Sequence, residues 1–185
     1  MDIFNGFVEF LRFRKQWDAT DFDKAVQEGA QNGYIDIIKL CKEWGDISYN
    51  EVMAGASDNG HVELAKLCKE WRATCYNWAM AGASGNGHVE LVKLCKEWGA
   101  TDFDRAMAYA AEGGHIEIVK LCKEWGATDF DSAMAKAAER GHVDIVRLCK
   151  EWAMRNVVSN RHFEIAQLCK EMEKKIVAAF EYFNK

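Results

Sequence analysis

The stretch GHIEIVKLCKEWGATD, residues 114–129, recurs with small changes along most of the chain. The glycine that opens it recurs every 27 residues, at Gly6, Gly33, Gly60, Gly87, Gly114 and Gly141. The tryptophan near its end keeps the same spacing, at Trp17, Trp44, Trp71, Trp98, Trp125 and Trp152. A fixed period between about 20 and 50 residues is typical of stacked supersecondary units, so the sequence predicts a repeat array.

Each unit contains two helical patterns. In one unit, apolar residues recur at i, i+3, i+4, i+7 and i+8 over residues 103–111, and a second, wider apolar pattern covers residues 116–125. Gly114 ends the first helix and Gly126 ends the second, since glycine tolerates the left-handed conformation that follows many helices. With no proline and no alternating strand pattern, the sequence predicts an all-α fold, an α-solenoid of stacked helix-turn-helix units.

The start of the first helix carries polar residues that favour a helix cap. Thr101 followed by Asp104 predicts a capping box, and Asp102 is a second cap candidate. In another unit Ser48 is expected to cap the helix, because the preceding Ile47 has no polar side chain.

The whole chain, residues 1–185, is predicted to form a single repeat domain. An N-terminal half repeat over 6–17 precedes five full repeats over 20–152. A truncated repeat and a long capping helix follow over 153–185, and one apolar stripe places that helix at roughly His162–Tyr182. We expect about thirteen helices, one for each half unit, and no β-hairpins.

Composition and charge narrow the classes of partner. The chain is 49% apolar and 29% charged, which is ordinary for a soluble protein, and its net charge is −5 without any basic stripe. Nucleic acid is therefore not an expected partner. No apolar run approaches the roughly 18 residues of a membrane span, and residues 1–13 do not resemble a signal peptide. These features favour a cytoplasmic protein without a membrane partner.

Six of the seven cysteines form a column with one member in each successive unit: Cys41, Cys68, Cys95, Cys122, Cys149 and Cys169. Packed helices place such residues about 8–10 Å apart. A disulfide needs Cα atoms within roughly 7 Å, so we expect buried free thiols in a reducing compartment. Cys75 lies outside the column and is expected to be a partly exposed free thiol.

The segment MAYAAEGGHIEIVKL, residues 107–121, with the Gly126-Ala127 that follows, resembles an ankyrin repeat. The resemblance extends in register over nearly the whole chain. Ankyrin units have about 33 residues, so these units are shorter by about six, which fall where the family has its β-hairpin finger. The repeated amino-acid sequence also resembles the shortened ankyrin-type arrays of large DNA viruses. The resemblance implies a solenoid that binds proteins. For a viral protein, it implies an adaptor or decoy directed at a host protein.

Other residue patterns favour structural roles. One histidine per unit, at His61, His88, His115, His142 and His162, precedes a cysteine by seven residues. Two helical turns separate these side chains by about 10 Å, which is too far for a zinc site, so the histidines are expected to bond neighbouring backbone. The tryptophans are expected in the core between repeats. No catalytic set or phosphate loop is apparent, so we expect no enzyme activity, cofactor, metal or small-molecule substrate.

The candidate site lies where otherwise similar units differ. Two sets of positions on the first helices vary, four residues apart: Lys24, Glu51, Trp78, Arg105 and Ser132, then Glu28, Gly55, Gly82, Tyr109 and Lys136. Spacing of i, i+4 places both sets on one face, opposite the alanine stripe. In the resemblance, the second set aligns with the variable ankyrin position that faces partners.

Trp, Tyr and Arg are enriched at binding hot spots, so Trp78 is predicted to anchor a protein partner above a floor of Gly55 and Gly82. Ordinary surface variation is the alternative explanation of these positions. For the whole chain, the sequence predicts a monomeric protein–protein interaction module. A structural or self-assembling role is the other possibility.

Overall fold

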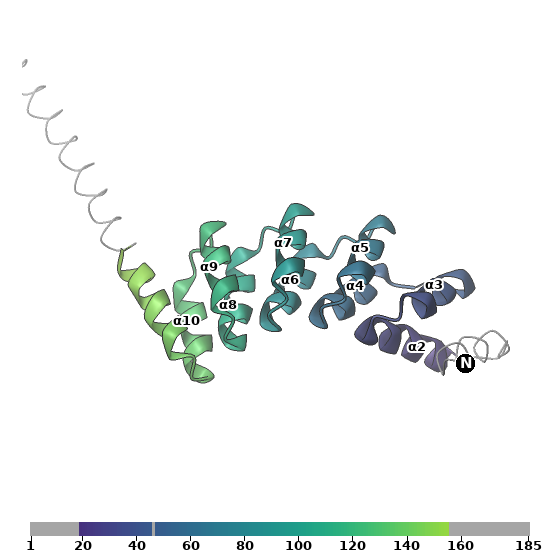
Figure 1. The fold of residues 1–185 in the computed structure, drawn as a ribbon, viewed down its shortest axis with the longest axis horizontal. Helices are drawn as coiled ribbons and strands as arrows, with labels where there is room; N and C mark the ends of the chain where they lie inside the picture. The colour runs from purple at the N-terminus through teal and green to yellow at the C-terminus, as the bar shows by residue number, and fades with distance from the viewer. Residues whose placement is uncertain (1–18, 46, 156–185) are drawn as a thin grey trace, which may run out of the picture.

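The computed structural model describes residues 19–45 and 47–155, in which every regular element is an α-helix (Figure 1). Each predicted full unit contains two helices. They are α2 (Ala19–Asn32) and α3 (Ile35–Trp44); α4 (Tyr49–Asp58) and α5 (Val62–Glu70); α6 (Tyr76–Gly85) and α7 (Val89–Glu97); α8 (Phe103–Gly113) and α9 (Ile116–Glu124); and α10 (Phe130–Glu139) with a helix over 143–155. The predicted helical repeat array is therefore confirmed for the described residues.

The helices form two rows (Figure 1). First helices of successive units pack directly on one another, α2 on α4, α4 on α6, α6 on α8 and α8 on α10. The second helices α5, α7 and α9 form the other row. The predicted half repeat over 6–17 and the capping helix at roughly His162–Tyr182 lie outside the described residues.

Small residues let the first helices approach closely. Ala106, Met107, Ala110 and Ala111 are buried on α8, and the other first helices bury alanines at equivalent positions. The second helices bury larger side chains, such as those of Ile118, Val119 and Cys122 on α9. Fully burying a Val, Ile or Leu side chain stabilises a fold by about 1.5–3 kcal/mol, so much of the stability comes from the interior shared between neighbouring units.

The described cysteines of the column are buried and free, as predicted: Cys41, Cys68, Cys95, Cys122 and Cys149. Burial raises the pKa of Cys68, Cys95 and Cys122 to about 12, and that of Cys41 to about 11. Cys75 is half-buried, and its Sγ–H donates to the carbonyl oxygen of Asn50 at 3.2 Å.

These environments predict the thiol reactivity of the folded protein. Because the thiolate is the reactive species, Cys75 should react slowly with Ellman's reagent, and the buried column should react only on unfolding. The assay uses a Cys169→Ser background, since Cys169 lies outside the described residues. Adding Cys75→Ser should then abolish the native signal. A native signal that persists in this variant would contradict the assignment of the column to the core.

A glycine of one unit and the histidine of the next fit together at each junction. The left-handed glycines Gly33, Gly60, Gly87 and Gly114 have φ between 71° and 82°, and a Cβ on any of them would overlap the histidine ring of the next unit. That ring's Nε2–H donates to a backbone carbonyl of the preceding unit at 2.7–3.1 Å, in His61, His88, His115 and His142. The predicted backbone bonding of the histidines is confirmed for these four.

The capping box predicted at Thr101 and Asp104 is wrong, and the second candidate, Asp102, is the cap. The Asp102 carboxylate accepts from the N–H of Arg105 at 3.2 Å. Asp104 instead accepts from the N–H groups of Thr128 and Asp129 in the next unit, at 2.6 and 2.8 Å. An aspartate side chain is shorter than the glutamate or glutamine that closes a capping box.

Asn50 and Asn77 link their units to the next in the same way as Asp104, each accepting backbone N–H bonds from residues 24 and 25 positions later. The cap expected at Ser48 is confirmed, since its hydroxyl accepts from the N–H of Glu51.

The tryptophans lie at the edge of the core rather than within it, which corrects the prediction. Trp71, Trp98, Trp125 and Trp152 are half-buried, each packed on an aromatic ring from the start of the same unit at 5.5–5.9 Å. Trp44 is 44% exposed. A lysine of the preceding unit covers each half-buried ring at 4.3–5.4 Å from its centroid. Lysine stems cover apolar surface while the charge stays in water, so these rings need not be fully buried.

Two second helices end unusually. Arg72 replaces the glycine after Trp71 and takes φ 71°, which costs roughly 1–2 kcal/mol relative to glycine. The last described helix instead runs through Trp152 to residue 155, because Ala153 stands where three other units have a left-handed residue, Arg72, Gly99 or Gly126. The predicted boundary between 152 and 153 therefore falls inside a helix.

Candidate binding groove

Three of the variable side chains meet on the face of the first helices. Trp78 of α6 is 62% exposed and Tyr109 of α8 is 41% exposed. The guanidinium carbon of Arg105, on α8, lies 3.7 Å from the centre of the Trp78 ring and 5.7 Å from that of Tyr109. A cation over an aromatic face at these distances is attracted by the ring quadrupole. The structure thus brings the predicted anchor into contact with the next unit.

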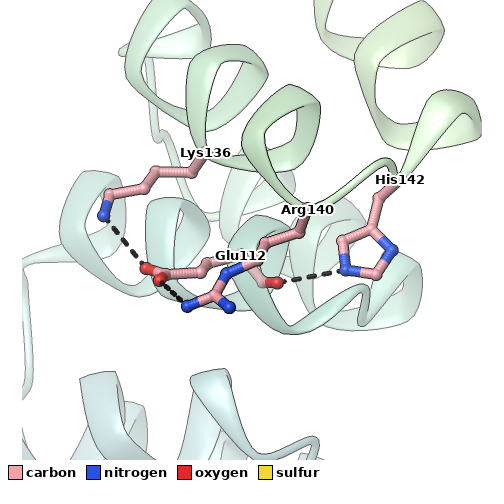
Figure 2. A network of polar contacts seen from close by, with 4 residues as sticks. All are labelled: Glu112, Lys136, Arg140 and His142. Atoms are coloured by element: carbon pink, nitrogen blue, oxygen red, sulfur yellow. Dashed lines mark hydrogen bonds and ion pairs between the residues drawn. The ribbon is translucent and has the colours of Figure 1, made fainter.

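A carboxylate paired with two cations joins α8 to the next unit (Figure 2). Glu112 pairs with Arg140 at 3.0 Å and with Lys136 at 3.1 Å. Hydrogen bonds from Arg140, and then from Lys136, hold the pKa of the Glu112 carboxyl below its usual range. The backbone carbonyl of Glu112 also accepts from His142. One residue of α8 therefore contacts three residues of the next unit.

The Glu112 pairing predicts a specific acid-side loss of stability. Its folded pKa is depressed, so it contributes stability above its unfolded pKa, and that contribution is lost as pH falls through the folded pKa. Glu112→Gln should therefore lower the melting temperature at pH 7. The difference from wild type should begin to shrink near the ordinary glutamate pKa of about 4.3 and disappear only below the depressed folded pKa. The exposed Glu70→Gln serves as control and should show no such difference. A Glu112→Gln effect equal at pH 7 and pH 3 would contradict this account.

These charged and aromatic side chains surround a hollow of about 590 Å³. Its lining residues come from the first helices α4, α6 and α8 and from the residues that follow α6 and α10: Ala54, Asp58, Trp78, Ala81, Gly82, Gly85, Asn86, Arg105, Tyr109, Glu112, Gly113 and Arg140. We call this hollow the groove. Its floor includes Gly82 and Gly85, which follow Trp78 by one and two helical turns on α6. Because glycine has no side chain, the Asp58 carboxylate can rest on the backbone at Gly82, and the Tyr109 ring can lie close to Gly85.

Asp58 reaches into the groove from the end of α4. Its Oδ1 occupies the place where a Cβ of Gly82 would lie, so the carboxylate rests on the backbone of α6. Burial raises the pKa of the Asp58 carboxyl, and the nearby His88 partly offsets this. A partly desolvated carboxylate is more sensitive to a partner's charge than a fully hydrated one.

The predicted site residues separate into three groups. Trp78, Arg105 and Tyr109 line the groove, as does the predicted floor residue Gly82. Lys136 reaches it only through Glu112, and Ser132 is half-buried, its N–H donating to Asp129.

The remaining predicted residues lie towards the N-terminal end of the array. Glu51 and Gly55 line a separate hollow of about 470 Å³ between α2 and α4. Lys24 and Glu28 are exposed on α2 and line neither hollow. The predicted face is therefore divided, and its aromatic part forms the groove.

Sequence reasoning missed Asp58, Glu112 and Arg140. The signal for the first two was available, since they follow the first variable set by seven residues and so lie on the same helix face. Arg140 occupies a position held by Asn59, Asn86 and Gly113 in other units, and variation there could have identified it.

The described residues hold neither a candidate metal site nor a candidate membrane span. No group of three or more His, Cys, Asp or Glu side chains in 19–45 and 47–155 is placed to hold a metal ion. In the same part of the chain, no helix is both long and apolar enough to cross a membrane. No protein-family model matches the sequence, and no curated protein is significantly similar to it.

Proposed function

We propose that the chain is a non-enzymatic protein-binding module that docks its partner in the groove. The observation that carries the proposal is Trp78, an indole 62% exposed beside a glycine-floored hollow. Equivalent positions in the other units hold Lys24, Glu51, Arg105 and Ser132, so the repeat itself does not require an aromatic ring there. Burying an exposed tryptophan in a partner typically contributes about 2 kcal/mol or more, roughly thirtyfold in affinity.

The sequence resemblance of residues 107–121 to an ankyrin repeat supports the same proposal, since such arrays act as binding platforms. For a viral protein, the proposed function is that of an adaptor or decoy, which binds a host protein as a monomer in the cytoplasm. The buried free thiols accord with a reducing compartment.

Affinity capture of the full chain from the relevant cell, followed by mass spectrometry, tests the proposal. The expected result is a protein captured by the wild type and lost with Trp78→Ala. Capture of the same proteins by wild type and variant at equal yield would contradict it.

Self-association is the second candidate function. Val143 and Met154 are 56% and 62% exposed on the helix over 143–155, at the end of the described array. Two exposed apolar side chains on one helix offer a surface for contact with another copy. Size-exclusion chromatography with light scattering distinguishes the candidates. A monomer at all concentrations favours the adaptor, and mass that grows with concentration favours assembly.

A further inference from the structure

We propose that the groove recognises a carboxylate side chain on its protein partner, and that Arg105 is the residue that binds it. This inference rests on the proposed function and names the chemistry of its partner. It starts from the charges that line the groove, which are Asp58, Arg105, Glu112 and Arg140. Arg140 is neutralised locally, because it pairs with Glu112 at 3.0 Å. Arg105 has no carboxylate within ion-pair distance among the residues that the structure describes.

Arg105 is also held in position for a ligand. Its guanidinium lies over the Trp78 ring at 3.7 Å and within 5.7 Å of Tyr109, so one face of the cation is covered. A guanidinium binds carboxylates through N–H groups at its edge, and stacking leaves that edge free. Ordering the side chain in advance lowers the entropy lost on binding. The stack therefore presents an oriented donor fork beside an apolar surface.

The surrounding charge favours a carboxylate over a phosphate. Asp58 rests on Gly82, one helical turn along α6 from the Trp78 ring that Arg105 covers. Glu112 adds a second carboxylate to the lining, although its two cations compensate it. A phosphorylated side chain carries nearly two negative charges, so its attraction to Arg105 and its repulsion from Asp58 both increase. The cost of removing it from water rises more steeply with charge, so one carboxylate matches the single unpaired cation of the lining better. The groove thus suits an extended segment with one acidic side chain next to an apolar one.

The test measures peptide binding to the full-length ¹⁵N-labelled protein by NMR. The probes are four capped hexapeptides that share leucine and glycine residues and differ at one position, which is glutamate, glutamine, lysine or phosphoserine. The Trp78 indole N–H resonance, assigned with Trp78→Phe, reports occupancy. We expect the glutamate peptide to shift this resonance at concentrations up to about 5 mM, and to bind at least tenfold more tightly than the glutamine peptide.

Variants of arginine locate the contact. Arg105→Gln should remove the tenfold preference for glutamate, and Arg105→Lys should not fully restore it, since lysine lacks the planar fork. Arg147→Gln, which changes an exposed arginine on the helix over 143–155, should leave the preference intact. Unchanged melting temperatures would show that Arg105→Gln acts on binding rather than on folding.

Several results would overturn the assignment: no shift with the glutamate peptide, equal binding of glutamate and glutamine peptides, or tighter binding of the lysine or phosphoserine peptide. These failures are distinct from failure of the proposed function. If capture of the cellular partner still depends on Trp78, the groove remains a docking site and only its carboxylate preference is wrong. If capture does not depend on Trp78, the groove is not the partner's site, whatever the peptides show.

Discussion

Replacing Trp78 and Tyr109 together by alanine is expected to weaken partner binding at least thirtyfold, with little change in melting temperature. Both rings are substantially exposed, at 62% and 41%, so the folded monomer gains little from them. In a complex they would be buried, and each buried aromatic anchor typically contributes about 2 kcal/mol or more. The two substitutions also remove the surfaces on which Arg105 is stacked. Titration calorimetry with the captured partner measures the loss.

The matched control removes an exposed apolar side chain from the other row of helices. Ile116, the first residue of α9, is 38% exposed and lines neither hollow, so Ile116→Ala should leave affinity unchanged. Lys96 and Lys123 are poor controls on that row, because they cover the rings of Trp125 and Trp152. Loss of binding with Ile116→Ala but not with Trp78→Ala would place the partner on the second helices. Unfolding of Trp78→Ala would assign that ring to the fold.

Gly87→Ala is expected to destabilise the protein by about 2–5 kcal/mol, more than an ordinary glycine substitution. Gly87 has φ 81°, which costs an alanine roughly 1–2 kcal/mol. The added Cβ would also lie 2.6 Å from the His115 ring, and overpacking adds about 1–3 kcal/mol. The ring cannot move freely, because its Nε2–H donates to the Gly85 carbonyl. Urea denaturation followed by circular dichroism measures the change in unfolding free energy.

Gly99→Ala separates the two causes. Gly99 also has positive φ, at 107°, but nothing lies within 4 Å of its added Cβ. Its cost should come from backbone strain alone, without a steric part. In the double variant Gly87→Ala/His115→Ala the steric part should disappear, so the two substitutions should not be additive. Equal costs for Gly87→Ala and Gly99→Ala would show that the histidine ring does not constrain the junction.

The 27-residue period was sufficient to predict the helical array, because each unit carries its own apolar pattern and its own stop signals. Gly114 and His115 illustrate this, since the helix boundary falls where the sequence places it. The period also identified one shared face for the variable positions. The spacing of residues along one helix determines which of them share a face, and the packing of neighbouring units does not change this.

Contacts between units were harder to predict, because they depend on how far one helix is shifted relative to the next. Asp104 was expected to cap its own helix and instead binds the next unit. Arg105 crosses to Trp78, and Asp58 crosses to Gly82, so the groove is built by side chains that leave their own helix. The partial burial of the tryptophans also depends on contacts between units, because the lysines that cover them come from the preceding unit.

The central claim is that a protein partner covers Trp78. Hydroxyl-radical footprinting with mass spectrometry tests it directly, because oxidation of a side chain reports its exposure to solvent. In the free protein, Trp78 and Trp44 should both be oxidised, as they are 62% and 44% exposed. In the complex, the account predicts strong protection of Trp78 and unchanged oxidation of Trp44, which lies at the end of α3 outside the groove. Undiminished oxidation of Trp78 in a saturated complex would contradict it.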